Sequence, residues 1–271
     1  MVETVYVRSP MSLAPVTDPA PPVDAPFVLK RPTGPIGPLV FASPHSGDLY
    51  PADMGGCADL PTISLRSAED ALVDRLIASA PERGIAVIAG RVSRAYVDLN
   101  RAETELDPAL VQGGVAGEPS PKVAAGYGVV PRLSGDGRAL YVRRLSSEEV
   151  EGRLARVHRP YHAALGELMG QARAAAGTAV LVDWHSMPSR AAGGRGRARP
   201  GLDVVLGDRH GASCTAGVTR RLRSLFEGVG WRVGLNQPYA GGHSTQLWGR
   251  PADGFQAVQI ELNRALYLDE A

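Results

Sequence analysis

The sequence predicts an α/β fold with a largely parallel or mixed sheet. Short apolar runs alternate along the chain with segments of helical pattern, and this alternation is typical of α/β domains. The run TAVLVDWHS (178–186) is apolar almost throughout, as expected for a strand buried on both faces. The 271 residues suffice for one large domain or two small ones, and we find no internal repeat.

In the first half of the chain, the Pro-rich residues 1–25 predict an extended or disordered arm. GPLVFAS (37–43) predicts a buried strand. Residues 67–84 predict a helix, with Ser67 as N-cap and Gly84 at its end. A second strand is expected over 85–93, with AYVDLN (95–100) as its continuation or neighbour.

In the second half, residues 146–177 form the longest helical pattern. Ser146 and Glu149 have the spacing of a capping box, and Pro160 is expected to break or kink this helix. The remaining patterns predict strands at 203–208, 231–237 and 255–263, and a helix at 214–230.

Composition excludes several functional classes. The net charge is +1, so the charge balance indicates neither a nucleic acid nor an anionic membrane as partner. No apolar run approaches the roughly 18 residues of a membrane span, and the N-terminus lacks the pattern of a signal peptide. The two cysteines, Cys57 and Cys214, form no paired motif, which favours a reduced, cytoplasmic protein.

Two segments predict long loops. Residues 102–140 are rich in Gly and Pro and lack a clear period. SRAAGGRGRARPG (189–201) carries four arginines among glycines. This second loop is either a solvated mobile segment or a lid or anion-attracting rim.

Ionisable side chains follow several predicted strands where those strands end. In α/β sheets, ligands gather beyond the carboxyl ends of the strands, so we expect these side chains to meet at one edge. The set comprises His45, Arg94, Asn100, Arg101, His185 and Glu261.

Together these residue types suffice to hydrolyse an amide on an acidic substrate. Two histidines and a carboxylate can hold Zn²⁺, a further carboxylate can act as base, and arginine can bind an anion. Each residue also has a structural interpretation: the histidines as hydrogen-bonded structural residues, Glu261 paired with Arg264, and Arg101 paired with Asp98 or Glu103. The sequence contains no HExxH, CxxC or G-x-S-x-G motif.

Six blocks occur in one order: SPHSGDLYP, SRAYVDLNR, VDWHSMP, DVVLGDRHGASC, PYAGGHSTQLWG and VQIELNRALY. Together they resemble the N-formylglutamate amidohydrolase family from about residue 37 to the C-terminus. That family is similar in fold to zinc carboxypeptidases and the aspartoacylase group. The resemblance therefore implies a three-layer α/β/α domain with a central mixed sheet, which we expect to span residues 26–271 as a single catalytic domain.

The resemblance implies a zinc site. His45 and His185 would be two ligands. The carboxypeptidase pattern would make Asp48 the third ligand, whereas the N-formylglutamate family carries an acid at the start of the next predicted helix, which is Asp70. We favour Asp70.

The resemblance also implies roles for the other polar residues. Glu261 would be the general base, and Asn100 with Arg101 would hold the substrate carboxylate. Arg94 would assist with the carboxylate or polarise the scissile carbonyl. Asp183 lies two residues before His185, so it can orient that ligand or bond to nearby backbone.

One segment departs from the family pattern. Relatives commonly carry Gly-Gly, an aromatic residue and then Thr-Arg, where this chain has GGHSTQLWG. The resemblance implies substrate-binding roles for Thr245 and for Gln246, which occupies the arginine position. His243 replaces the aromatic residue and is either a new polar contact or a rim residue. Relatives usually continue into a C-terminal helix, so we expect the sequence as given to lack a trailing segment.

The sequence therefore predicts a zinc-dependent amidohydrolase acting on an acidic N-acylamino acid. The resemblance implies N-formyl-L-glutamate, a compound of histidine breakdown. Two alternatives stay open: a carboxypeptidase-like or N-acyl-peptide hydrolase, and a non-catalytic anion-binding protein of the same fold. The acyl group, the amino acid and the oligomeric state are not determined by the sequence.

Overall fold

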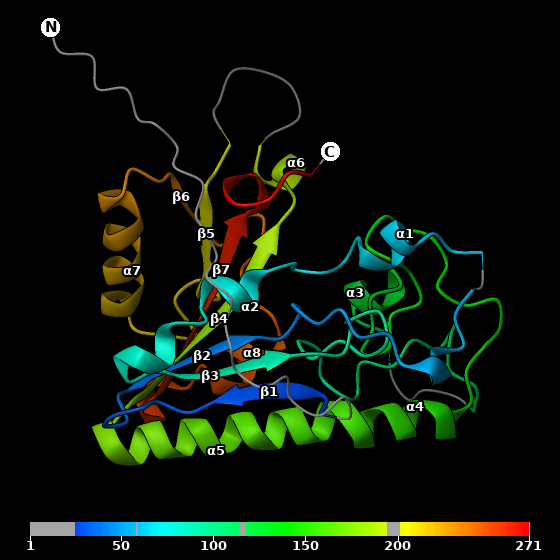
Figure 1. The fold of residues 1–271 in the computed structure, drawn as a ribbon, viewed down its shortest axis with the longest axis horizontal. Coiled ribbons are helices and arrows are strands. Elements are labelled where there is room, and N and C mark those ends of the chain that lie inside the picture. Colours follow the sequence, from blue (N-terminus) through cyan, green and yellow to red (C-terminus); the bar gives the residue numbers. More distant parts are fainter. Residues whose placement is uncertain (1–24, 58, 114–117, 194–200, 271) are drawn as a thin grey trace, which may run out of the picture.

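A twisted seven-stranded sheet lies at the centre of the molecule (Figure 1). The computed structural model describes residues 25–57, 59–113, 118–193 and 201–270. The strand order is β1-β3-β2-β4-β7-β5-β6. The strands are β1 (Phe27–Lys30), β2 (Leu39–Ser43), β3 (Ala86–Gly90), β4 (Ala179–Met187), β5 (Val204–Gly207), β6 (Val233–Leu235) and β7 (Phe255–Asn263).

The sheet is mixed and mostly parallel, as predicted. The pairs β2–β3, β2–β4, β4–β7 and β5–β6 are parallel, whereas β1–β3 and β5–β7 are antiparallel. The central strands β4 and β7 are buried along most of their length, which explains their continuous apolar character. Because β2, β4 and β7 run in the same direction side by side, their carboxyl ends meet at one edge of the sheet.

Helices cover both faces of the sheet. They are α1 (Thr62–Arg66), α2 (Val73–Leu76), α3 (Pro121–Ala124), α4 (Ser147–Arg153), α5 (Arg159–Ala176), α6 (Ser189–Ala192), α7 (Ala216–Gly228) and α8 (His243–Trp248). Short 3₁₀ helices lie at Ala52–Met54, Ala80–Arg83, Pro251–Asp253 and Arg264–Leu266. None of the helices within the described residues is both long enough and apolar enough to cross a membrane.

The core has two main parts, one on each face. On one face, Leu165 and Met169 of α5 belong to the same buried cluster as Leu181 of β4. On the other face, α7 packs through Leu222 onto a cluster that contains Ile260 of β7. This arrangement is the expected three-layer α/β/α architecture.

The predicted helix over 67–84 is wrong. Ser67 is the C-cap of α1, and regular helix resumes only in α2 and in the 3₁₀ helix that follows. The Asp70 N–H donates to the carbonyl of His45, and Leu72 has a positive φ of 65°. These tertiary constraints bend the chain around Asp70 and override the local helix propensity.

The expected strand over 95–100 is also wrong, because this segment is a series of buried turns. The Asp98 N–H bonds to the carbonyl of Val129, and the Asn100 N–H bonds to the Asp98 carboxylate. Apolar side chains such as Leu99 pack into the core without joining the sheet.

Pro160 does not break the long helix. A π-helical turn (Leu154–His158) joins α4 to α5, and in it the Arg159 N–H bonds to the carbonyl of Leu154. This wider turn accommodates the proline, so α4 and α5 run as one rod along the bottom of Figure 1.

The expected N-terminal arm lies almost entirely outside the described residues, as does 194–200 of the arginine-rich loop.

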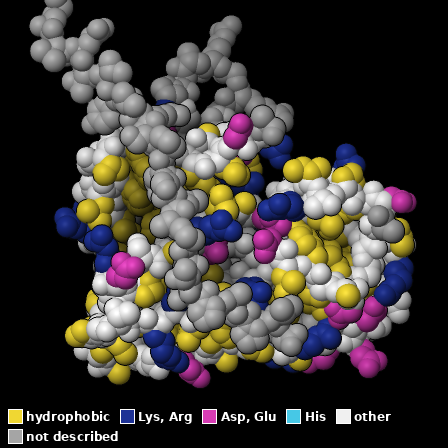
Figure 2. Space-filling model, in the orientation of Figure 1, with side chains coloured by type: hydrophobic (Ala, Val, Ile, Leu, Met, Phe, Trp, Pro, Cys, Tyr) yellow, Lys and Arg dark blue, Asp and Glu magenta, His cyan; other side chains and the backbone are white. Residues whose placement is uncertain are grey.

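Strand β1 and helix α8 were not predicted. Their sequences are short and carry no clear period, so their pairing and packing decide their structure. On the face seen in Figure 2, basic and acidic side chains are interspersed, in keeping with the net charge of +1.

The capping box predicted at the start of α4 is present, and it gives a stability prediction. Ser146 Oγ accepts from the Glu149 N–H (3.1 Å), and the Glu149 carboxylate accepts from the Ser146 N–H (2.8 Å). We expect Ser146→Ala to lower the free energy of unfolding by about 1 kcal/mol, measured by urea denaturation. Ser224→Ala, at an exposed position in the middle of α7, is the control and should not lower it, because alanine favours a helix interior. Equal midpoints for Ser146→Ala and wild type would contradict this role.

Candidate metal centre and active site

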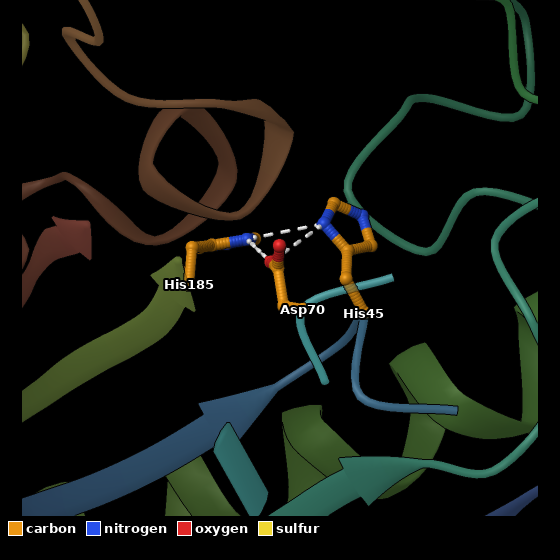
Figure 3. A group of neighbouring side chains, drawn as sticks. All are labelled: His45, Asp70 and His185. Carbon is orange, nitrogen blue, oxygen red and sulfur yellow. Dashed lines mark hydrogen bonds and ion pairs between the residues drawn. The ribbon is translucent and has the colours of Figure 1, made fainter. Parts of the chain in front are cut away.

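Three buried side chains point toward one another at the carboxyl edge of the sheet (Figure 3). His45 lies just after β2, Asp70 lies in the turn before α2, and His185 lies on β4. His185 Nδ1 is 3.1 Å from His45 Nδ1 and 3.0 Å from Asp70 Oδ2. His45 Nδ1 is 3.5 Å from the same carboxylate oxygen.

This donor set fits a metal site. Two imidazole nitrogens and one carboxylate oxygen face a common point, and all three side chains are at most 3% exposed. Two histidines and a carboxylate are a known set of zinc ligands that leaves a fourth position open. Asp48, the alternative third ligand, is exposed and does not join the group.

The other carboxylate oxygen of Asp70, Oδ1, contacts two further side chains. Arg264 Nη2 is 3.2 Å from Asp70 Oδ1, and Ser186 Oγ donates to the same oxygen at 3.3 Å. Burial alone would raise the pKa of Asp70, but hydrogen bonds from His185 and His45 outweigh burial and lower it. The ion pair of Arg264 is therefore with Asp70, and not with Glu261 as in the structural interpretation of the sequence.

Asp98 has a role at the site that was not predicted from the sequence. His45 Nε2 is 2.7 Å from Asp98 Oδ1, and Arg94 Nη2 donates to Asp98 Oδ2 at 2.6 Å. Burial would raise the pKa of Asp98, but Arg94 and His45 hold it well below its usual value. A carboxylate that bonds the ring nitrogen facing away from the metal fixes the tautomer and orientation of a metal-binding histidine. The sequence signal for this role was the acid in SRAYVDLNR, within the motif that supplied Arg94 and Asn100.

His185 has a comparable environment at its far nitrogen. Asp183 Oδ2 lies 3.0 Å from His185 Nε2, and Asn100 Nδ2 lies 3.2 Å from the same atom. Both Asp183 oxygens are buried and lack a well-aligned hydrogen bond within the described residues. Burial lowers the pKa of His185, but Asp183 and Asp70 outweigh it and raise this pKa well above its ordinary value. The expectation that Asp183 lies beside His185 is met.

Glu261 lies next to His185 on the neighbouring strand. The two residues are partners in the parallel register of β4 and β7, and both line the same cavity. Burial is the main cause that raises the pKa of Glu261 to about 7, although His185 lowers it and Asp70 raises it further. Gln259 Nε2 donates to Glu261 Oε1 at 2.7 Å. No role was predicted for Gln259 from the sequence, although its position two residues before Glu261 places it on the same strand face.

A cavity of about 330 Å³ opens onto the three convergent side chains. Arg94, Asn100 and Arg101 line it, as the sequence analysis expected. Asn100 is largely engaged: its Oδ1 accepts from the Ser244 N–H (2.9 Å), and its Nδ2 faces His185 and Gln259. The ion pair of Arg101 is with Glu105 (3.6 Å), rather than with Asp98 or Glu103.

Thr245 and Gln246 do not line this cavity. Thr245 is buried and its hydroxyl donates to the carbonyl of Gly242, whereas Gln246 is exposed on α8. His243 packs against His162, with ring centroids 5.4 Å apart, and also lies outside the cavity lining. The Gly- and Pro-rich segment 102–140, which was predicted to be a long loop, contributes several residues to the cavity lining.

Comparison with known proteins identifies the family. The family model for N-formylglutamate amidohydrolase matches residues 37–268. The N-formylglutamate deformylase of Pseudomonas aeruginosa is 33% identical over 237 residues, which are 86% of this chain and 83% of the relative. The N-formylglutamate deformylase of Pseudomonas putida is 31% identical over 239 residues, 86% of this chain and 82% of the relative.

Two solved structures are also similar to this chain. The crystal structure of N-formylglutamate amidohydrolase from Ralstonia eutropha is similar with a TM-score of 0.84 and 37% identity, covering 91% of this chain and 89% of that one. A gene product of Agrobacterium tumefaciens shares the fold, with a TM-score of 0.63 and 21% identity, over 91% of this chain and 88% of that one. The chain therefore belongs to the N-formylglutamate amidohydrolase family.

Proposed function

We propose that the protein is a zinc-dependent hydrolase that cleaves N-formyl-L-glutamate to formate and L-glutamate. The observation that carries this proposal is the convergence of His45, Asp70 and His185 beside the buried carboxyl of Glu261. The names of the Pseudomonas and Ralstonia relatives support the choice of substrate. The two free cysteines suit a cytoplasmic enzyme. Cleavage of N-formyl-L-glutamate would give it a role in histidine breakdown.

His45, Asp70 and His185 are proposed as the metal ligands. Zinc, when bound, supplies a Lewis acid that lowers the pKa of water to about 7 and polarises a carbonyl oxygen. Asp98 and Asp183 act on the far nitrogens of the two histidines, where they favour the tautomer whose Nδ1 is free to bind.

Glu261 is proposed as the general base and acid. Its carboxylate takes a proton from the attacking water, whose oxygen bonds to the formyl carbon. When the C–N bond breaks, the protonated carboxyl returns that proton to the departing nitrogen. A pKa near 7 suits a group that must both accept and donate the proton at neutral pH.

Positively charged groups on the cavity wall are proposed to position the substrate. Arg94, which is bonded to Asp98, is proposed to stabilise negative charge that develops on the carbonyl oxygen. Arg101 is proposed to bind the α-carboxylate. Asn100, at the same wall, contributes chiefly by fixing His185 and the backbone of Ser244.

The direct test is hydrolysis of N-formyl-L-glutamate by the purified protein, with and without a chelator, followed by return of zinc. Release of glutamate that the chelator abolishes and zinc restores supports the proposal. The same assay is run on a panel of other N-acylamino acids and short N-acyl peptides. Hydrolysis of these compounds in place of N-formyl-L-glutamate would indicate a carboxypeptidase-like enzyme. A protein that retains zinc and hydrolyses none of these compounds would contradict the proposed activity and favour an anion-binding role.

Glu261→Gln is expected to keep the bound metal and to lower kcat about 10²- to 10⁴-fold, because the amide cannot accept a proton. Metal content measured by elemental analysis and initial rates provide the two readouts. Glu167→Gln, at an exposed position on α5, makes the same chemical change away from the cavity and should leave both unchanged. A Glu261→Gln protein of near wild-type rate would exclude Glu261 as the base.

The pH profile should have an acid limb set by Glu261. Only the carboxylate form accepts a proton, and burial raises its pKa to about 7. A bound cation lowers this pKa, so we expect kcat/KM to fall tenfold per pH unit below a midpoint at or under pH 7. Rates measured from pH 5 to 9 test this expectation. An acid limb that persists unchanged in Glu261→Gln would assign it to another group.

Asp98→Asn is expected to weaken metal binding about 10- to 100-fold, because the amide no longer favours the required His45 tautomer. Competition with a chromophoric chelator measures this affinity. Asp107→Asn is a matched control: Asp107 is also buried and pairs with an arginine, Arg132, but does not line the cavity. Equal metal affinity in Asp98→Asn and Asp107→Asn would contradict the role of Asp98.

A further inference from the structure

A lysine that the proposed mechanism does not use lines the same cavity. Lys122 is the second residue of α3, in the Gly- and Pro-rich segment 102–140. It borders the cavity together with Arg101, and both belong to the lining that surrounds the three convergent side chains. These two cations come from segments with no regular pairing to the sheet.

One carboxylate contacts both Arg101 and the residue that caps α3. Glu105 Oε1 lies 3.6 Å from Arg101 Nη1 and accepts from Ser120 Oγ at 3.2 Å. Ser120 is the N-cap of α3, where its hydroxyl oxygen also accepts from the Val123 N–H. The guanidinium of Arg101 and the first turn of α3, which carries Lys122, are therefore tied to the same side chain.

The other arginines of the cavity are already paired. Arg94 is paired with Asp98 (2.6 Å), and Arg264 with Asp70 (3.2 Å). Lys122, in contrast, forms no ion pair with any residue that the structure describes, and Arg101 Nε is buried without a hydrogen-bond partner there. Although Lys122 is exposed, partial burial and the nearby charges of Arg101 and Arg94 lower its pKa. Two incompletely neutralised cations held on one wall are a site for an anion.

We propose that Lys122 binds the side-chain carboxylate of the substrate while Arg101 binds its α-carboxylate, so that the pair selects N-acylated dicarboxylic amino acids. This inference rests on the proposed function, because it takes the amide-cleaving site as given. An ammonium group is a compact point charge on a flexible stem, which suits a carboxylate at the end of a flexible side chain. A neutral side chain at the same place would form no ion pair with Lys122, so the site would favour the acidic substrate.

The kinetic test compares two substrates that differ by one charge, N-formyl-L-glutamate and N-formyl-L-glutamine. We expect Lys122→Gln to lower kcat/KM for N-formyl-L-glutamate about 10- to 100-fold, mainly through KM, and to leave N-formyl-L-glutamine unaffected. Lys122→Arg should retain most of the preference for the acid. Arg220→Gln removes one positive charge from an exposed position on α7 and should not change the ratio of the two substrates. Equal losses on both substrates, or no loss on either, would overturn the proposal.

A binding test separates this inference from the proposed activity. In the Glu261→Gln background, which removes the proposed base, calorimetry measures binding of both compounds without turnover. Preferential binding of N-formyl-L-glutamate that Lys122→Gln abolishes supports the inference, even if the wild-type protein proves unable to cleave the compound. Binding of the two compounds with equal affinity, or a preference that persists in the Lys122→Gln double variant, refutes it. Matching thermal midpoints confirm that the variants are folded.

Discussion

The parallel pairing of β2, β4 and β7 is the constraint on which the site depends. The pairing fixes the carboxyl ends of the three strands at one edge, and it places His185 directly beside Glu261. His45 follows β2 after one intervening residue and meets His185 with ring centroids 4.7 Å apart. Asp70 is then fixed to this pair through backbone, because its N–H bonds to the carbonyl of His45. A shift of one residue in the β4–β7 register would turn Glu261 to the other face of the sheet.

The same arrangement gathers four carboxyl groups that are buried from solvent. Asp70, Asp98, Asp183 and Glu261 are all at most 6% exposed. Removing carboxylates from water is costly unless each is compensated, and here the compensation is uneven. Arg94 and Arg264 pair with Asp98 and Asp70, whereas both Asp183 oxygens lack an aligned partner in the described part of the chain. A divalent cation bound among these groups would balance the excess, and binding of a metal would then be linked to stability of the folded site.

How much could be predicted depended on whether a residue belonged to a strand. His185 and Glu261 lie at the ends of apolar runs, and His45 directly follows one, so the pattern alone placed all three at one edge. Asp70 and Asp98 lie in turns whose shape is set by bonds to distant backbone, and local propensity misassigned both segments. The family resemblance supplied Asp70, but its substrate roles for Thr245 and Gln246 have no counterpart in the cavity lining. Lys122 lies in a segment without periodicity, so its place in the cavity lining became evident only from the structure.

The central claim is that His45, Asp70 and His185 bind one metal ion together. Anomalous X-ray diffraction from crystals of the zinc-loaded protein, recorded on both sides of the zinc absorption edge, tests it most directly. We expect a single strong anomalous peak in contact with Nδ1 of both histidines and with Oδ2 of the aspartate. A zinc peak bound elsewhere, for example between His162 and His243, with none at these three atoms, would contradict the account.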